Sequence, residues 1–200
     1  MSVYTLTRIT PKGEQALSLS VVPTEGEEIT LTVGLSVYEA IGAPSVGDRL
    51  SEKDYLHLSA EYEKRQAYRA AVRILEVCSP SRKALFRKLV QKGISRDAAE
   101  FAVSRMSALG YIRETEQARS LAASLVRRNL WGPRRVYAAL CEKGYSGSDA
   151  REAIDAACDA GEIDFTEARR ALLARESKKG ASPEKLRATL YRYGYGSDTD

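Results

Sequence analysis

Hydrophobic positions follow two different periods along the 200-residue chain. Within the first fifty residues they alternate with polar positions in YTLTRI (4–9), ALSLSVV (16–22) and EITLTVGL (28–35), which is the period of half-buried strands. The connections PKGE and PTEGE carry the Pro and Gly residues that favour turns. The pattern predicts a small antiparallel sheet of three strands. One helical turn is expected next, at VYEAIG (37–42), and then a loop or short edge strand, APSVGDRL (43–50).

A helical period begins with SEKD (51–54), which resembles a capping box with Asp in place of the usual Glu. Apolar residues then recur at helical spacing to about Val77. Pro80 lacks an N–H and restricts the residue before it, so we expect SPS (79–81) to end this helix. Farther along, Gly after a basic residue indicates a helix end, and Ser or Thr soon afterwards indicates the next start.

The helical part of the sequence repeats itself. LVQKGISRDAAEFAVSRMSALGYI (89–112) returns 51 residues later as LCEKGYSGSDAREAIDAACDAGEI (140–163), and LYRYGYGSD (190–198) begins it again. Helices of about a dozen residues are unstable alone in water, so packing must stabilise them. A repeat of this size indicates tandem helical bundles. The second and third copies predict five helices, at about 115–129, 133–143, 148–160, 165–178 and 183–193.

These periods predict a mainly α fold: tandem three-helix-bundle repeats forming an elongated rod, preceded by a small N-terminal antiparallel β segment. The tail GSDTD (196–200) is expected to fray. The predicted parts are a β-rich segment (1–50), a first three-helix bundle with an extended first helix (51–112), a second bundle (113–163) and a third, incomplete bundle (164–200).

The middle helix of each bundle has a predicted inward face, because its apolar residues fall on one side at 100° per residue. These faces comprise Leu85, Phe86, Leu89 and Val90 in the first bundle, Val136, Tyr137, Leu140 and Cys141 in the second, and Leu186, Leu190 and Tyr191 in the third.

Composition argues against several kinds of site. No apolar run approaches the ~20 residues of a membrane span, and no secretory signal is visible, so we expect a cytoplasmic protein without membrane contact. Cys78, Cys141 and Cys158 form no C-x-x-C pair and are expected to be small buried hydrophobes. His57 is the one histidine, without a catalytic or zinc motif. No Gly-rich phosphate loop is present. We therefore expect no enzyme activity, cofactor or metal.

Acidic residues gather where the first helix of a bundle begins. Glu114 and Glu116 lie at the start of one such helix, and Asp164 and Glu167 lie at the start of the next. Carboxylates at these positions favour the positive end of the helix dipole, so we interpret them as helix caps rather than as paired catalytic acids.

The net charge of +4 is unevenly distributed, because residues 1–60 hold 4 basic and 8 acidic side chains while residues 61–200 hold 27 and 19. Basic residues that recur once per bundle can follow a phosphate backbone. They are equally typical of a solvated face with basic helix C-termini. Trp131 is expected to staple helices together, with a stacking or interface role as the alternative. The candidate binding residues are Arg82, Lys83, Arg87, Lys88, Lys92, Arg127, Arg128, Trp131, Arg134, Arg135, Lys185, Arg187 and Arg192.

The order and spacing of these motifs resemble the RecX family, the regulators of the bacterial RecA recombinase. The resemblance covers about residues 65–195 and departs from the family pattern where the third bundle lacks its last helix. It is carried by SRKALFRKLVQKG (81–93), GPRRVYAALCEKGY (132–145), TEQAR (115–119), TEARR (166–170) and the GYI and GEI ends of the last helix of each bundle.

The resemblance implies three-helix modules that lie in the groove of a RecA–DNA filament. It also implies inhibition of recombinase and ATPase activity, by blocking filament growth or by promoting disassembly, within recombination, DNA repair and the SOS response. We therefore expect a monomer whose partner is the RecA filament on single-stranded DNA, with weak direct DNA contact. The alternatives are a non-specific single-stranded nucleic-acid-binding module and a protein-binding scaffold.

Overall fold

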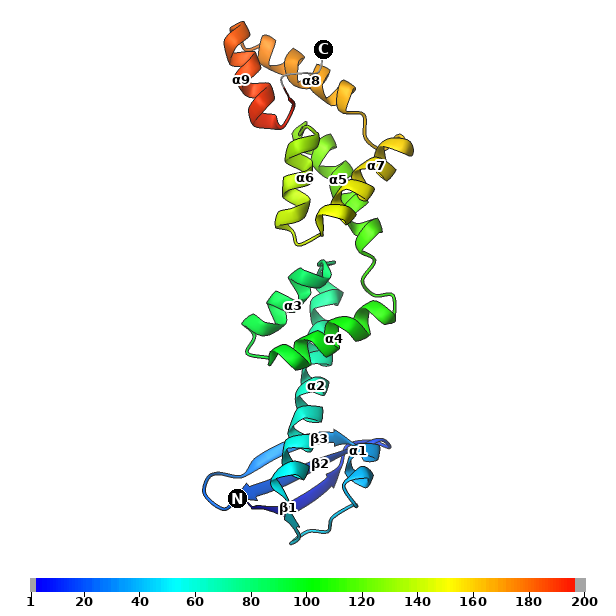
Figure 1. The fold of residues 1–200 in the computed structure, drawn as a ribbon, viewed down its shortest axis with the longest axis vertical. Helices are drawn as coiled ribbons and strands as arrows, with labels where there is room; N and C mark the ends of the chain where they lie inside the picture. Colours follow the sequence, from blue (N-terminus) through cyan, green and yellow to red (C-terminus); the bar gives the residue numbers. More distant parts are fainter. Residues whose placement is uncertain (1–2, 197–200) are drawn as a thin grey trace. The chain divides into compact units, whose positions relative to one another are not determined.

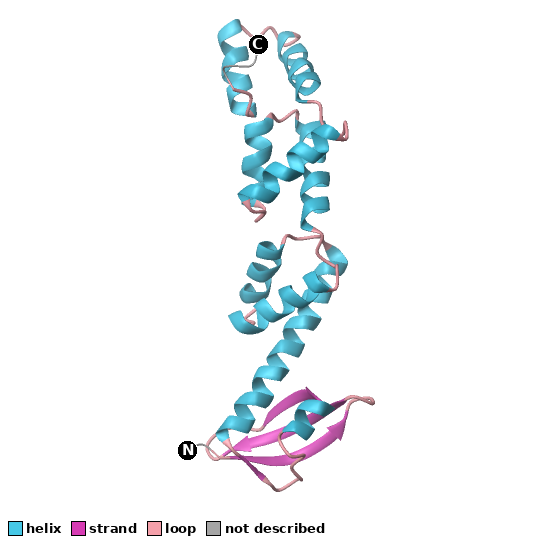
Figure 2. Cartoon of the chain, turned by 45° about the vertical axis from the view of Figure 1, so that its right-hand side comes forward, coloured by secondary structure: helices cyan, strands magenta, loops and turns pink. Residues whose placement is uncertain are grey.

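The computed structural model describes residues 3–196 of the chain. The chain forms two compact units, one made of Met1–Ile74 with Lys88–Met106 and the other of Leu75–Arg87 with Ser107–Asp200. Within the described residues, three strands, one short helix and a fourth strand come first, and every later element is a helix (Figure 1; Figure 2). The predicted class, mainly α with a small N-terminal antiparallel sheet, is confirmed.

The sheet of the first unit has the strand order β3-β2-β1-β4, with antiparallel pairing throughout. The three predicted strands are present, and the segment expected to be a loop or short edge strand contains a short edge strand, which pairs through Leu50 with Tyr4. The expected helical turn is α1 (Leu35–Ala40). The strands are β1 (Tyr4–Pro11), β2 (Ala16–Pro23), β3 (Ile29–Gly34) and β4 (Arg49–Leu50).

Helix α2 (Glu52–Val77) packs its first turns on this sheet. Leu58 of α2 is fully buried in the same cluster as Leu6, Leu19 and Val33 of the strands. A small sheet buries little apolar surface alone, so the helix supplies the second layer of the core. The predicted start of α2 is confirmed, because the Asp54 N–H donates to Ser51 Oγ (3.1 Å) and Ser51 Oγ donates to the Asp54 carboxylate (2.6 Å).

The five helices predicted from the second and third copies of the repeat are all present, with boundaries that differ from the prediction by at most one residue. The remaining helices are α3 (Arg82–Gln91), α4 (Arg96–Ala108), α5 (Glu114–Asn129), α6 (Pro133–Glu142), α7 (Gly147–Asp159), α8 (Phe165–Ser177) and α9 (Pro183–Tyr193).

Helices α5, α6 and α7 share a core in the second unit. Val136 and Leu140 of α6 are fully buried there, beside Ala122 of α5 and Ala153 of α7. Small alanines let the three helix backbones approach closely around the larger side chains. The predicted inward face of α6 is confirmed, with Tyr137 and Cys141 half-buried at its rim, and α3 likewise buries Leu85 and Leu89 and half-buries Phe86 and Val90.

Helix α9 differs from its two counterparts. It has no buried residue; Leu186 and Leu190 are half-buried, and Tyr191 is 73% exposed. The predicted inward position of Tyr191 was therefore wrong. The reason is that α9 packs on α8, and within residues 3–196 no third helix follows to cover its other side. The expected fraying of the tail falls, for residues 197–200, outside the described residues.

The three cysteines are half-buried rather than fully buried, which corrects the prediction. Cys141 and Cys158 lie at the rim of the core that α5, α6 and α7 share. Burial raises the pKa of the Cys158 thiol, and the carboxylates of Asp155, Asp159 and Asp164 raise it further, so this thiol stays protonated at neutral pH.

Candidate interaction surface

The basic residues of α3 lie on the solvent side of the helix. Leu85 and Leu89 are fully buried one turn apart, which turns the positions between them outward. Arg87 and Lys88 are accordingly exposed, and so is Lys92, one residue past the end of the helix. These three cations therefore point away from the buried face of α3.

Arg82 has a structural partner. Its backbone N–H donates to Glu114 Oε1 (2.8 Å), and its Nε lies 3.3 Å from Glu114 Oε2. Glu114 is the first residue of α5, so one carboxylate holds the start of α3 against the start of α5. The Arg82 side chain is still 58% exposed, which makes it both a link between helices and part of the surface.

Trp131, Arg135 and Arg192 meet where α6 begins and α9 ends. The Arg135 guanidinium lies 4.3 Å from the centroid of the Trp131 ring and 5.6 Å from that of Tyr193. It also donates to the Arg192 carbonyl oxygen (2.9 Å). Trp131 itself packs at the rim of the core of α5, α6 and α7. These contacts fit the stapling role expected for Trp131.

The start of one middle helix contacts the end of the next middle helix twice within the second unit, and we call each of these a cap contact. In the first, Ser81 Oγ, before α3, donates to the Lys143 carbonyl, after α6 (2.8 Å). In the second, the Gly132 N–H, before α6, donates to the Tyr193 carbonyl, at the end of α9 (2.7 Å). The carbonyl groups at a helix end lack partners within the helix, and each cap contact satisfies one of them.

Each cap contact requires a glycine for two reasons. Gly144 and Gly194 have φ angles of 99° and 90°, which disfavour other residues. A Cβ on Gly144 would lie 2.7 Å from Ser81 Oγ, and one on Gly194 would lie 2.5 Å from the backbone nitrogen of Arg135. The close approach therefore depends on the missing side chain.

A buried tyrosine follows each of these glycines. Tyr145 is 7% exposed and Tyr195 is 4% exposed. The Tyr195 hydroxyl donates to the Leu130 carbonyl (3.1 Å), and burial raises the pKa of Tyr195 to about 12. A glycine followed by a buried tyrosine thus recurs at both cap contacts, in KGY (143–145) and YGY (193–195).

The other candidate residues are exposed side chains of α3, α5, α6 and α9. Arg127 and Arg128 lie in the last turn of α5, where cations suit the negative end of the helix dipole. Lys83, Arg134, Lys185 and Arg187 are also exposed. Within residues 3–196, no ion pair joins any of these six side chains to an acid. They can meet an external anion without first giving up an internal partner.

Two curated proteins named Regulatory protein RecX, from Xanthomonas axonopodis pv. citri (strain 306) and from Xanthomonas citri, are each 42% identical to the chain over 98 residues. The alignment covers 48% of this chain and 56% of each relative. These matches support a RecX family assignment. No protein-family model matches the chain.

Two solved RecX structures share the fold. The crystal structure of a regulatory protein RecX matches with a TM-score of 0.71 and 16% identity over 97% of this chain and 95% of that one. RecX from Lactobacillus salivarius matches with a TM-score of 0.60 and 20% identity over 68% of this chain and 90% of that one. The RecX fold therefore extends beyond the segment of sequence similarity.

The described residues contain no helix long and apolar enough to cross a membrane. They also contain no cluster of three His, Cys, Asp or Glu side chains that could hold a metal ion.

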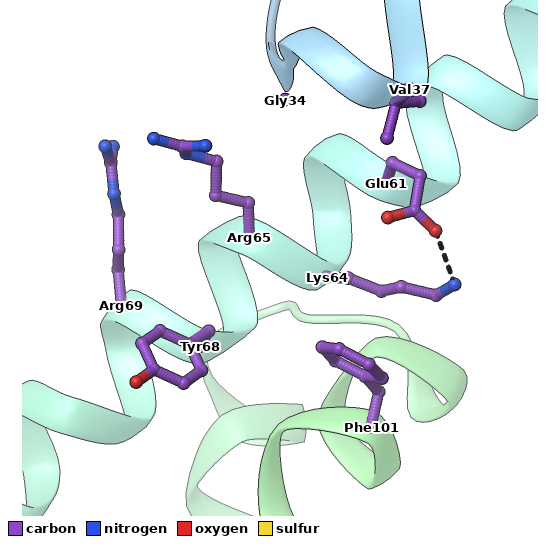
Figure 3. A pocket seen from close by; sticks show the side chains of 8 residues that line it. All are labelled: Gly34, Val37, Glu61, Lys64, Arg65, Tyr68, Arg69 and Phe101. Carbon is purple, nitrogen blue, oxygen red and sulfur yellow. Dashed lines mark hydrogen bonds and ion pairs between the residues drawn. The ribbon is translucent and has the colours of Figure 1, made fainter. Parts of the chain in front are cut away.

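One basic group escaped prediction from the sequence, and it lies in the first unit of this RecX-like chain. A groove of about 460 Å³ runs along α2 between α1 and α4 (Figure 3). The segment KRQAYR (64–69) carries cations at helical spacing, which could have indicated this group. The candidate cations were identified by their recurrence in the repeat, and this segment precedes the repeat. The groove is lined by Gly34, Val37, Glu61, Lys64, Arg65, Tyr68, Arg69 and Phe101.

Proposed function

We propose that this chain is an inhibitor of RecA that binds the RecA filament on single-stranded DNA and lowers its ATPase and recombinase activity. In this proposal it acts as a monomer in the cytoplasm, within DNA repair and the SOS response. The observation that carries the proposal is the 42% identity to curated RecX regulatory proteins over 98 residues. The bundles 51–112, 113–163 and 164–200 each contribute one set of exposed cations to the interface.

The exposed cations are the proposed contact residues. Side chains such as Arg87, Arg128 and Arg134 project from separate helices and have no acidic partner among the described residues. They suit either an acidic protein surface or exposed phosphate. Trp131 and Arg135 have a different role in the proposal, because their contacts hold α6 against α9 and so position the cations around them.

The test is the ATPase rate of RecA on single-stranded DNA while this protein is titrated in. A fall in rate at amounts below one protein per RecA protomer supports a filament regulator. An unchanged rate at concentrations well above that of RecA contradicts the proposal.

Single charge reversals then locate the interface. Arg134→Glu should raise the half-inhibitory concentration by about 3- to 10-fold, because a charge at an interface rim mainly changes association. Arg170→Glu is the matched control, since Arg170 is an exposed residue of α8 outside the candidate set. An equal loss of inhibition in both variants would show that only net charge matters. Unchanged inhibition in both would show that the exposed face of α6 does not contact the filament. Arg135 is left intact because its replacement would disturb the cap contact.

A non-specific nucleic-acid-binding module is the second candidate, favoured by the same series of cations without acidic partners. Binding to a labelled oligonucleotide without RecA separates the two functions. Affinity for a single strand falls by roughly 0.7 log units per log unit of salt for each phosphate neutralised. We expect weak binding at physiological salt. Tight, sequence-independent binding there would favour the module, and a scaffold for another protein would bind neither DNA nor RecA.

A further inference from the structure

The groove along α2 combines two kinds of side chain that the proposed function does not use. Arg65 and Arg69 are one helical turn apart, so they share a face of α2. Tyr68 lies on the same helix, and Phe101 faces it from α4. Figure 3 shows both arginine side chains extending the same way, with the rings of Tyr68 and Phe101 on the side away from the guanidinium groups. All of these residues belong to the first unit.

The two arginines have no acid to balance them. The groove contains one carboxylate, Glu61, and Lys64 occupies it at 2.6 Å. Within residues 3–196 neither Arg65 nor Arg69 forms an ion pair, and Arg65 Nε is shielded from solvent without a hydrogen-bond acceptor. Like charges at this spacing repel each other. An anion bound between the guanidinium groups would remove the repulsion and accept their hydrogen bonds.

The aromatic side chains indicate that the ligand also contains a flat ring. Phe101 is 44% exposed, although a phenyl ring gains from burial, and Lys64 Nζ lies 5.4 Å from the ring centroid. A flat ring placed against Phe101 or Tyr68 would cover this apolar surface. Phosphate contacts together with aromatic stacking are the combination by which proteins bind single-stranded nucleic acids. A groove volume of about 460 Å³ falls within the range of small-ligand sites.

We propose that this groove binds a nucleotide of a single-stranded nucleic acid, with a phosphate between Arg65 and Arg69 and the base against Phe101 or Tyr68. The open groove favours a segment of a strand over a free nucleotide, because a strand continues past both ends. The site does not depend on RecA, so the chain would contact nucleic acid directly through its first unit.

The phosphate half of the site is tested by fluorescence anisotropy of a labelled oligothymidylate, with the full chain, without RecA and at about 50 mM salt, where phosphate contacts are strong. Arg65→Gln with Arg69→Gln should weaken binding about 10-fold or more, and Arg69→Gln alone should weaken it by less. Arg73→Gln is the matched control, because Arg73 is an exposed residue of α2 outside the groove, and it should change affinity less than about twofold. Equal losses in all variants would overturn the assignment.

The base half is tested with Phe101→Ala. The loss of stacking should weaken binding of oligothymidylate by about 5- to 100-fold but leave binding of an abasic strand of equal length unchanged. The same loss with both strands would overturn base stacking. Thymidine monophosphate should compete only weakly. Competition by it as strong as that of the strand would assign the groove to a free nucleotide instead, and binding only of an acidic peptide would assign it to protein.

These outcomes are distinguishable from a failure of the proposed function. The binding assays contain no RecA, so loss of ATPase inhibition leaves the groove assignment untouched. Conversely, a loss of oligonucleotide binding in the variant with both Arg65→Gln and Arg69→Gln, with inhibition of RecA intact, would support the groove without bearing on the proposed function.

Discussion

Helices α6 and α9 are copies of one sequence pattern, but they fold into different environments. In α6 the residues Val136 and Leu140 are fully buried between α5 and α7. In α9 the equivalent Leu186 and Leu190 are only half-buried. The difference shows that the repeated pattern specifies a helix and its inward face, whereas the depth of burial depends on whether a third helix covers that face.

The ends of the two helices differ much less than their middles. Each ends in an αL glycine that contacts the start of the preceding middle helix. The partner groups have changed, from the Ser81 hydroxyl at the first cap contact to the Gly132 N–H at the second. The position of the contact therefore persists while its chemistry varies.

Core truncation should give the largest difference between the two helices. Leu140→Ala should cost about 2–5 kcal/mol, because it opens a cavity in a closed core, and Leu190→Ala about 1 kcal/mol, because its side chain is half-exposed already. Urea unfolding followed by circular dichroism gives the free energies, and amide hydrogen exchange locates the loss in α6 or α9. Equal costs would show that α9 is packed as tightly as α6.

The cap glycines should give the next largest effect. Gly194→Ala and Gly144→Ala each combine an unfavourable φ with a Cβ closer than 3 Å to a neighbour. Gly161→Ala provides the control, because Gly161 has a φ of 70° and a methyl group added there would meet no atom within 4 Å. The control should cost about 1–2 kcal/mol for the αL conformation alone.

The excess over that control measures the close approach at each contact. Gly194→Ala should show the larger excess, because its Cβ would meet the Arg135 backbone, whereas at Gly144 the Ser81 hydroxyl can rotate away. Thermal unfolding midpoints for the three variants check the order. A Gly194→Ala midpoint equal to that of Gly161→Ala would mean that the second cap contact adapts without cost.

Much of this architecture is predictable from the sequence, because helix boundaries depend on local signals. Pro133, the glycines at helix ends and the Ser182 N-cap mark α6 and α9 to within one residue. The exposure of Tyr191 was not predictable, because periodicity identifies a face of a helix but not what covers it. The sequence left β4 open between a loop and a short edge strand, because two residues are too few to show an alternating pattern and only the pairing with β1 defines the strand.

The candidate surface was predictable only in part. Counting charges finds Arg135, but it does not reveal that its guanidinium lies on Trp131 rather than in solvent. The groove was missed because Phe101 is 32 residues from Arg69 in the sequence and joins it only in the folded first unit. Residue type and spacing thus indicate where charge is, whereas the partners of each charge come from tertiary structure.

Replacing Arg135 should weaken the second cap contact but not the first, with a smaller loss of stability than the glycine variants. Arg135→Lys keeps the charge but loses the planar stacking on Trp131 and the bond to the Arg192 carbonyl, which should cost about 0.5–1 kcal/mol. Trp131 is the single tryptophan of the chain, so its emission reports directly on this contact. Arg128→Lys, on the exposed end of α5, should leave the emission unchanged. Faster hydrogen exchange in α6 but not α9 would contradict the assignment.

The carboxylates of Glu162 and Glu176 should show the smallest difference, which concerns how far the effect of losing their hydrogen bonds extends. Hydrogen bonds from Arg119 (3.0 and 2.6 Å) lower the pKa of Glu162 and tie α5 to the residues after α7. A hydrogen bond from Lys179 and a second from Arg175 lower the pKa of Glu176 within its own stretch of chain. A carboxyl whose pKa is lower in the folded protein adds stability above its unfolded pKa, and this stability is lost as the pH falls through the folded value.

Carbon-detected NMR titration of the two side chains checks this. Arg119→Gln should return the pKa of Glu162 toward its ordinary value and leave that of Glu176 unchanged, and it should remove part of the loss of thermal stability between about pH 5 and pH 3. Lys179→Gln should raise the pKa of Glu176 toward its ordinary value and leave that of Glu162 unchanged. Because Glu162 joins segments 43 residues apart whereas Glu176 is bonded to its neighbours, only the Arg119 variant should also speed hydrogen exchange at the α5–α7 contact. Equal effects of both variants on that exchange would show that the long-range ion pair adds nothing to the bundle beyond its local charge.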